Sequence, residues 1–303
     1  MLDLHRLRVL CEVAQQGSML GAARTMSYSQ PAVSHHISRL EAEVGTPLVV
    51  RHGRGVRLTE AGSALVAHAS TALARLADAE EEIAAIVGLR AGRVRVAAFP
   101  TATAAFLPDA LAALATSAPG VVATLQEAEP PEALAALYRG DIDLAVVFGY
   151  DQAADAAAGF ELVHLFAEEI FIAVPAGHPA AADTTPVRLA DLATSPWVAG
   201  CTRCRTHLVD ACARAGVRPR LAYTTDDHLA VQRLVSRGLA VAALPALAFA
   251  LHHEPGVVRR QAPELGPRRV AALVATAPRS PATTAMLAEL VHATRQRYQG
   301  SLL

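Results

Sequence analysis

The chain has 303 residues, of which 52 % are hydrophobic and 18 % are charged, and its formal net charge is -1. This composition excludes a disordered or fibrous protein, and the length suggests two or three compact units. Because the net charge gives no general attraction to phosphate, any nucleic-acid site has to come from a local cluster of cations.

No segment has the pattern of a secretion signal or a membrane span. Residues 1–6 turn polar at once, and the most apolar stretch, 238–251, is broken by Pro245 and is shorter than the roughly 18 residues that cross a bilayer. We therefore expect a cytoplasmic protein that makes no membrane contact. The four cysteines are too few for a disulfide scaffold and are expected to be free thiols: Cys11, Cys201, Cys204 and Cys212.

Two short helices are predicted before residue 27. Apolar residues recur at helical spacing over 4–14, and Gly17 followed by Ser18 gives a stop and then a candidate N-cap. The second helix, 20–26, contains two adjacent alanines, whose small side chains let a neighbouring helix approach closely. This arrangement suits the corner of a helix-turn-helix.

A third helix is predicted to begin after Ser29, a good N-cap, with Pro31 in the first turn, where its missing N–H has no helical partner to lose. Its apolar residues recur at intervals of four, three and four and fall on one narrow stripe: Val33, Ile37, Leu40 and Val44. Short polar and cationic side chains face the other way, and Gly45 and Pro47 end the helix.

A small hairpin and a long helix follow. Two strands, 48–50 and 56–58, are joined by a turn with glycines, which together with the preceding helices predicts a winged helix-turn-helix. Thr59 is placed to cap a helix that runs to about Val87, followed by a linker at 89–93. Along this helix, apolar residues that alternate by four and three positions form one stripe, here called the seam. The seam predicts pairing with a second copy, either antiparallel or parallel: Leu65, Ala69, Ala72, Leu76, Ala79, Ile83 and Ile86.

Beyond Gly92 the pattern changes to short β runs that alternate with helical stretches, which predicts an α/β domain. The clearest strands are 94–99, 121–126, 142–148, 171–175 and 239–244. Helices are predicted over 103–116, 131–138, 205–215, 226–236 and 281–297.

With these motifs in this order, the chain resembles the LysR-type transcriptional regulators along most of its length. The most specific part, 17–62, contains Gly17-Ser18, Ala22-Ala23, Ser29-Gln30-Pro31-Ala32-Val33-Ser34, Leu40-Glu41, Gly45-Thr46-Pro47-Leu48, Arg51 and Leu58-Thr59-Glu60-Ala61-Gly62. Val49 departs from the family pattern, which usually has phenylalanine under the wing. The later half fits more loosely, through Leu107-Pro108, Gly140-Asp141-Ile142-Asp143-Leu144-Ala145, His178-Pro179 and 235–245.

The resemblance implies a fold class and a domain organisation. It implies an N-terminal all-α winged helix-turn-helix at 1–58, a long linker and dimerisation helix at 59–91, and a C-terminal α/β effector domain at 92–303. The effector domain would consist of two Rossmann-like subdomains, as in periplasmic binding proteins. Subdomain I would comprise 92–162 and 268–303, and subdomain II would comprise 163–267.

The resemblance also implies a function. The chain would regulate transcription by binding specific sequences in double-stranded promoter DNA, under the control of a small-molecule effector bound between the two subdomains. It would act as a homotetramer, a dimer of dimers. It would not be an enzyme, and no cofactor is predicted.

The third helix and the wing carry the candidate DNA contacts. Base edges lie at the floor of a major groove about 12 Å wide, so a reading helix presents short polar side chains opposite its core stripe. Gln30 suits an adenine or guanine edge, whereas Arg39 and the hydroxyls suit phosphates. The wing arginines suit a minor groove, although an ordinary solvated hairpin is the alternative. The predicted contacts are Ser29, Gln30, Pro31, Ser34, His35, Ser38, Arg39, Arg51, Arg54 and Arg57.

Four segments of the effector domain are predicted to converge on its cleft. Helix starts offer free N–H donors and positive dipole ends, which suit a small carboxylate or other polar metabolite. The alternative is that these residues only cap helices. The predicted effector contacts are Pro100, Thr101, Ala102, Thr103, Phe148, Tyr150, Cys201, Thr202, Arg203, Thr225 and Asp226.

The pattern C-x-x-C-x-x-H-x-x-x-x-C at 201–212 leaves three interpretations open: packing or effector contact, thiol redox sensing, and zinc binding. Thiolates at a helix N-terminus have a lowered pKa, which favours redox chemistry. The spacing alone is weak evidence for a metal, and Cys212 is too far along a helix to join a single tetrahedral site. Packing or effector contact is favoured, and no metal site is predicted.

Two other protein classes fit less well. A solute-binding protein has the same bilobed architecture, but such proteins are exported and lack a DNA-binding unit. An enzyme is disfavoured because the sequence has no Gly-rich phosphate loop, metal-binding helix motif or nucleophile elbow. The C-x-x-C also lacks the surrounding β-α-β pattern of a thioredoxin-like oxidoreductase.

Overall fold

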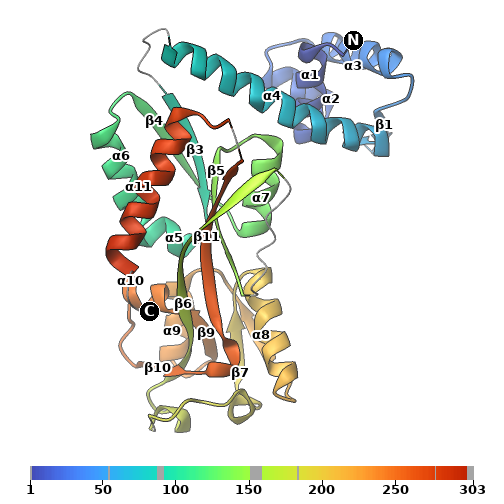
Figure 1. Cartoon of the computed structure of the whole chain (residues 1–303). Coiled ribbons are helices and arrows are strands. Elements are labelled where there is room, and N and C mark those ends of the chain that lie inside the picture. The colour runs from blue at the N-terminus through green and yellow to red at the C-terminus, as the bar shows by residue number, and fades with distance from the viewer. Residues whose placement is uncertain are drawn as a thin grey trace. The chain divides into compact units, whose positions relative to one another are not determined.

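The computed structural model describes residues 2–53, 55–86, 92–150, 159–182, 184–276 and 278–298. The chain divides into two compact units, one made of residues 1–90 with 134–142 and the other of residues 91–133 with 143–303. Figure 1 shows the helices and strands of both.

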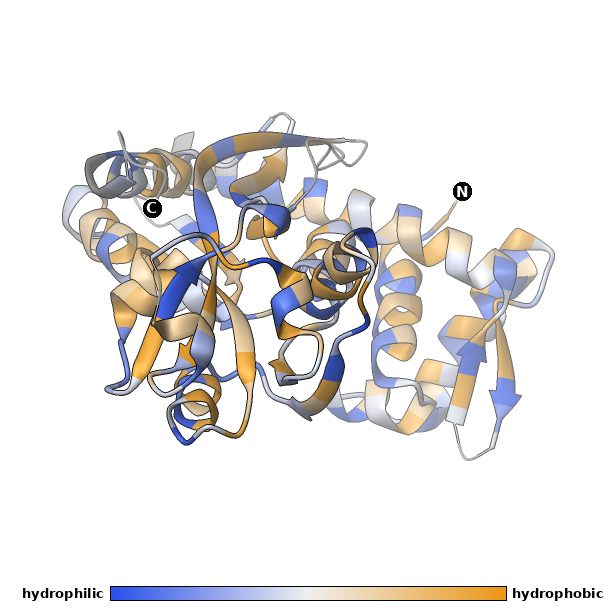
Figure 2. Cartoon of the chain, turned by 90° about the horizontal axis from the view of Figure 1, so that it is seen from below, coloured by the Kyte–Doolittle hydropathy of each residue, from blue (hydrophilic) through white to orange (hydrophobic). Residues whose placement is uncertain are grey.

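The N-terminal unit contains three short helices, a two-stranded wing and a long helix. They are α1 (Leu4–Gln16), α2 (Met19–Thr25), α3 (Gln30–Val44), β1 (Val49–His52), β2 (Gly55–Leu58) and α4 (Glu60–Ile86). The winged helix-turn-helix is therefore confirmed. Its helices carry both hydrophobic and hydrophilic residues along their length (Figure 2), as helices with one buried face do.

Side-chain caps fix where these helices begin. Ser18, Ser29 and Thr59 each accept a hydrogen bond on the hydroxyl oxygen from the backbone N–H three residues on, at 2.9, 3.3 and 2.9 Å. Gly17 ends α1 with a φ of 61°, a left-handed conformation that glycine adopts without steric cost. Asp3 also caps α1, accepting from the Arg6 N–H at 3.1 Å, although the sequence had not indicated it. These local bonds satisfy backbone donors that have no partner inside the helix.

The predicted core stripe of α3 is correct except at its end. Val33, Ile37 and Leu40 are at most 1 % exposed and pack in the core of the N-terminal unit. Val44, expected on the same stripe, is 38 % exposed. It is the last helical residue before the turn at Gly45, so no further helical turn extends the packed face beyond it.

The seam of α4 changes its environment along the helix. Leu65 and Ala69 pack against the core of the N-terminal unit. Leu76 and Ile83, further along the same seam, are 41 % and 61 % exposed. The second half of α4 therefore presents apolar side chains that the described residues leave largely exposed.

From residue 92 the chain alternates strands and helices, as predicted. The elements are β3 (Gly92–Ala98), α5 (Pro100–Ala105), α6 (Leu107–Ser117), β4 (Val121–Glu127), α7 (Pro130–Arg139), β5 (Leu144–Gly149), β6 (Phe160–Pro175), β7 (Pro196–Ala199), α8 (Thr202–Arg214), β8 (Arg220–Thr224), α9 (His228–Ser236), β9 (Val241–Pro245), α10 (Ala246–Leu251), β10 (Val257–Gln261), β11 (Pro267–Ala275) and α11 (Pro281–Tyr298). Short 3-10 turns cover Pro179–Ala181, Leu189–Leu192 and Pro263–Leu265.

In the described residues, nine strands form a mixed sheet in the order β4-β3-β5-β11-β6-β9-β7-β8, with β10 paired to β6. β3 runs parallel to β4 and β5, and β7 runs parallel to β8 and β9, so each half has its own parallel core. The antiparallel strands β6 and β11 join the halves (Figure 1). The first part of β6 pairs with β11, and its last part, 170–175, pairs with β9 and β10.

Several elements differ from the prediction. The single helix expected over 103–116 is two helices, because Phe106 has a φ of -134°, outside the helical range. The strands β7, β8, β10 and β11 and the helix α10 were not predicted. Every residue of β8 is exposed, so that strand has no hydrophobic pattern to detect. β11 starts with a proline and two arginines, which resemble a turn in the sequence.

Separate hydrophobic clusters pack in the two halves that β6 and β11 join, and they stabilise the C-terminal unit. One contains Phe99, Phe106 and Leu144, and another contains Ile172 and Trp197. Wherever the structure describes a helix, that helix is too short or too polar to cross a bilayer.

Candidate functional site

The outward face of α3 carries the predicted reading residues. Six of the seven positions singled out on this helix and its cap are exposed, and Ser34 is half-buried: Ser29, Gln30, Pro31, Ser34, His35, Ser38 and Arg39. The opposite face is anchored by its buried stripe, so the polar face has a fixed orientation. Rigid support of this kind is what a side chain needs to read a base edge.

The wing carries two of the three predicted arginines on opposite faces. Arg51 pairs across the hairpin with Val56, and Arg57 pairs with Val50. Because neighbouring positions on a strand point to opposite faces, Arg51 and Arg57 lie on opposite faces of the wing, and both are exposed. Arg54, the third predicted contact, lies outside the described residues.

A cavity of about 50 Å³ lies in the C-terminal unit, where β6 and β11 pass from one half of the sheet to the other. Some predicted effector residues line it: Pro100, Thr101, Phe148, Tyr150, Cys201, Thr225 and Asp226. Others are absent from its lining: Ala102, Thr103, Thr202 and Arg203. The Thr103 hydroxyl donates to the Ala98 carbonyl, and the Arg203 guanidinium donates to the Phe148 carbonyl at 2.5 Å, so both side chains stabilise the chain around the cavity.

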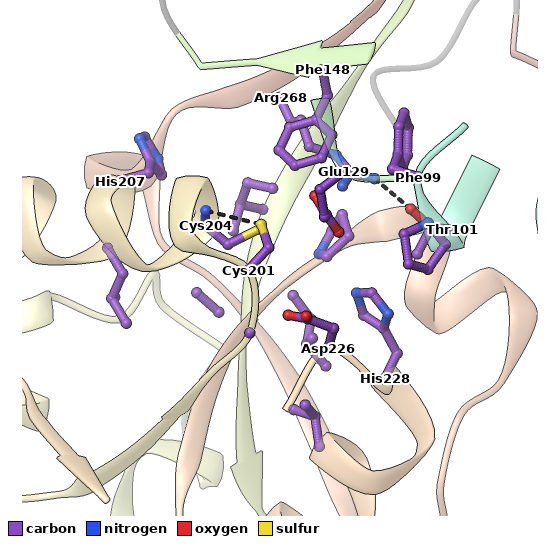
Figure 3. Close-up of a pocket in the computed structure, with 18 of the residues that line it drawn as sticks. Phe99, Thr101, Glu129, Phe148, Cys201, Cys204, His207, Asp226, His228 and Arg268 are labelled. Carbon is purple, nitrogen blue, oxygen red and sulfur yellow. Dashed lines mark hydrogen bonds between the residues drawn. The ribbon is translucent and has the colours of Figure 1, made fainter. Parts of the chain in front are cut away.

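A buried ion pair beside this cavity was not predicted from the sequence. Arg268 donates from Nε and Nη2 to Glu168 Oε1 at 2.8 and 2.5 Å. Its Nη2 also donates to Thr101 Oγ1 at 2.9 Å, the dashed line between these residues in Figure 3. The two charged side chains are at most 3 % exposed. Glu168 Oε2 also accepts from the Leu247 N–H at 2.8 Å, at the start of α10. A single carboxylate therefore connects β6, β11 and α10.

The surroundings of Arg268 favour its charged form. Burial, the largest single influence, lowers the pKa of Arg268, but Glu168, Tyr150 and Cys204 together raise it by more, so the net pKa is raised. The guanidinium also lies over the rings of Phe99 and Phe148, 4.9 and 4.7 Å from their centroids. Glu168, close before the apolar run 170–175 of β6, was the one sequence signal for this pair, because a charge in a buried strand needs a partner.

Cys201 and Cys204 lie together at the start of α8. The Cys204 N–H donates to the Cys201 sulfur at 3.2 Å (Figure 3). The interaction between the two thiol side chains lowers the pKa of Cys204 and raises that of Cys201. The Tyr150 hydroxyl further lowers the pKa of Cys204. The pKa values of the two sulfurs are therefore shifted in opposite directions, and Cys204 is the more acidic of the two.

His207 has other partners than the two thiols. Its Nε2 lies 2.7 Å from the Leu265 carbonyl, and its ring stacks on Tyr150 with the centroids 3.7 Å apart. Across the described residues, no three histidine, cysteine or acidic side chains gather closely enough to hold a metal ion. The zinc interpretation of the sequence pattern has no support in this geometry.

Two further titratable side chains line the cavity and were not predicted. Burial raises the pKa of Glu129, and the Cys201 thiol offsets only part of that rise. Burial, with a smaller contribution from the positive charge of Arg268, lowers the pKa of His228 to about 4. At neutral pH the imidazole is therefore uncharged. Nothing in the local sequence indicated either residue, since each reaches the cavity from its own loop or helix start.

Family models match both parts of the chain. Residues 4–63 match the bacterial regulatory helix-turn-helix protein, lysR family, and residues 88–295 match the LysR substrate binding domain. A probable hydrogen peroxide-inducible genes activator from Mycobacterium avium is 34 % identical over 86 % of this chain and 85 % of that protein. The transcriptional dual regulator GltC from Bacillus subtilis is 32 % identical over 82 % of each chain.

Solved structures share the fold. A full-length OxyR variant from Pseudomonas aeruginosa has a TM-score of 0.73 at 23 % identity, covering 97 % of this chain and 95 % of that one. Full-length CbnR in complex with its target DNA has a TM-score of 0.60 at 24 % identity, covering 97 % and 99 %. The helix-turn-helix, the α/β unit with its cavity and the two family matches lead to one conclusion: this chain belongs to the LysR family of transcription regulators, with a DNA-binding domain and an effector-binding domain.

Proposed function

We propose that the exposed face of α3 reads promoter DNA and that the cavity of the C-terminal unit binds the effector that controls this reading. The observation that carries the proposal is the division of α3 into a buried stripe and an exposed face of short polar side chains. The cavity supports the second part, because polar side chains from several segments line it. The protein acts in the cytoplasm and not as an enzyme.

The exposed seam of α4 supports self-association. Leu76 and Ile83 lie seven residues apart, on one face of the helix, and both are exposed among the described residues. A second copy of α4 covers them in a dimer, and two dimers make the tetramer. Leu76→Glu with Ile83→Glu leaves a monomer or a weaker assembly in analytical ultracentrifugation, whereas an unchanged assembly places the interface elsewhere.

The reading role is tested with Gln30→Ala. On the intergenic DNA beside its own gene, this variant is expected to lose about ten- to a hundredfold in affinity, because one base-edge contact is removed. Binding to unrelated DNA is expected to stay the same. Gln16→Ala, an exposed glutamine on α1, is the matched control. Equal losses on both DNAs for Gln30→Ala contradict base reading.

Thiol redox sensing is a second candidate function. The adjacent sulfurs of Cys201 and Cys204 and the lowered pKa of Cys204 favour it. Oxidation by hydrogen peroxide forms the bond between the two sulfurs, removes two electrons and two protons from the thiols, and yields two waters. One similar protein carries the name of a peroxide-inducible genes activator, which describes that protein.

Peroxide treatment separates the two candidates. If the thiols are the sensor, peroxide changes operator binding by the wild type, Cys201→Ser abolishes the change, and Cys11→Ser in the N-terminal unit leaves it intact. If operator binding does not respond to peroxide, the redox candidate is wrong and the effector candidate remains.

A further inference from the structure

The charge balance of the cavity points to a class of effector. Among the side chains that line it, Arg268 carries the one guanidinium, and this group is already bonded to Glu168 and Thr101. It also has an aromatic ring at each side, Phe99 and Phe148. The guanidinium of the cavity is therefore already paired within the protein. An incoming carboxylate would have to displace Glu168 to bind it.

Glu129 interacts with the Cys201 thiol, but one of its two carboxylate oxygens has no partner among the described residues. Its Oε2 atom is fully buried and accepts no hydrogen bond from the described residues. In Figure 3 its carboxylate points into the space between Cys201 and Asp226. A buried carboxylate oxygen without a donor costs free energy, and a ligand that brings a donor recovers it.

Asp226 supplies a second carboxylate from another segment. It lines the same cavity, is exposed on its outer side, and raises the pKa of Glu129 in addition to the burial that is the main cause. Its position is set by close contact with the chain before α8, where a Cβ on Gly200 would lie 2.8 Å from Asp226 Oδ1. Two acids thus border one space, one at its inner end and one at its mouth, with no free guanidinium between them.

The inner part of the space is small. It has about 50 Å³, and one water needs roughly 10 to 15 Å³, so it has room for a small polar group. The Tyr150 ring and the neutral His228 ring are part of the wall. Aromatic walls and paired carboxylates together suit an organic cation.

We propose that the effector carries a primary ammonium group, which donates hydrogen bonds to Glu129 and forms an ion pair with Asp226 at the mouth. This inference rests on the proposed function, in which the cavity is the effector site. It differs from the anionic ligand expected from the helix starts, and an anion is the main competing outcome of the test.

Calorimetric titration of the full-length protein with ethylammonium, acetate and ethanol compares a cation, an anion and a neutral compound of matched size. We expect heat of binding and a raised Tm with ethylammonium alone. Glu129→Gln is expected to weaken ethylammonium binding by about tenfold or more, because a charge-assisted hydrogen bond is lost. Glu127→Gln, an exposed acid two residues earlier, is the matched control and is expected to bind as the wild type does.

Glu129→Gln keeps the size of the side chain and removes the cost of burying a charge, so the unliganded variant is expected to be at least as stable as the wild type. A folded Glu129→Gln that binds ethylammonium as tightly as the wild type overturns the ammonium site, and so does wild-type binding of acetate in preference to ethylammonium. Operator binding separates this failure from that of the proposed function: if the wild type binds ethylammonium but its operator binding does not change, the effector role of the cavity is wrong.

Discussion

The reading face of α3 and the effector cavity are built in opposite ways. The reading face lies on one helix of 15 residues, whose cap, core stripe and end are all set by nearby residues. The cavity draws its walls from residues between Phe99 and Arg268, which meet only where β6 and β11 cross. One site is a local property of the chain and the other is a product of long-range pairing.

This difference predicts where each site is vulnerable. A local site loses stability in small steps, since each cap or turn contributes independently. A site held by one buried ion pair loses much more when one partner is removed, because the other charge stays buried without compensation.

Removing Glu168 is expected to have the largest effect. Glu168→Ala leaves Arg268 buried without its carboxylate and the start of α10 without its acceptor. We expect a loss of about 3 to 5 kcal/mol in the free energy of unfolding, measured by urea denaturation. Glu169→Ala is the control, because its one hydrogen bond is long, 3.5 Å to Gln261. A loss no larger than that of the control contradicts the central role of the ion pair.

The pH dependence of stability tests the buried imidazole of the cavity. The pKa of His228 falls from 6.5 to about 4 in the folded protein, so between these values the unfolded chain binds more protons. The contribution of this residue is complete above pH 6.5 and is lost as the pH falls toward 4, by roughly 2 to 3 kcal/mol. Unfolding of the wild type and His228→Gln at pH 7.5 and 4.5 measures it. Parallel losses in both proteins mean that other groups cause the acid sensitivity.

The N-terminal unit, which carries the reading face, is expected to lose less stability when a helix cap is removed. Ser18→Ala removes the acceptor for the Gly21 N–H at the start of α2 and is expected to cost about 1 kcal/mol. Ser18→Thr retains the oxygen and is expected to recover most of the loss. Thermal unfolding followed by circular dichroism detects both changes, and equal destabilisation by the two variants argues against a capping role.

The smallest expected effect is a gain in stability. Ser27, in the turn before α3, has a φ of 58°, which is unfavourable for a residue with a Cβ atom. Ser27→Gly is expected to stabilise the protein by about 0.5 kcal/mol, the relief of strain being partly offset by the greater freedom of glycine when unfolded. Ser27→Ala keeps the Cβ and is expected to give no gain. If both variants change stability alike, strain at this position is unimportant.

The sequence by itself determined the N-terminal unit, because its signals act over a few residues. Ser18, Ser29 and Thr59 reach backbone donors three positions away, and the stripe from Val33 to Leu40 follows from the helical period. It also indicated alternating strands and helices beyond Gly92, since buried strands are apolar runs wherever they pair.

Only the tertiary structure decided how the cavity is charged. Arg268 and Glu168 are separated by 100 residues and Arg268 and Thr101 by 167, and no local pattern states that they touch. Whether a charged side chain is available to a ligand depends on whether a residue from a distant part of the sequence already forms an ion pair with it. The sequence therefore placed Thr101, Tyr150 and Cys201 near a cleft, while strand pairing brought in Glu129, Glu168 and Arg268 and set the charge that a ligand meets.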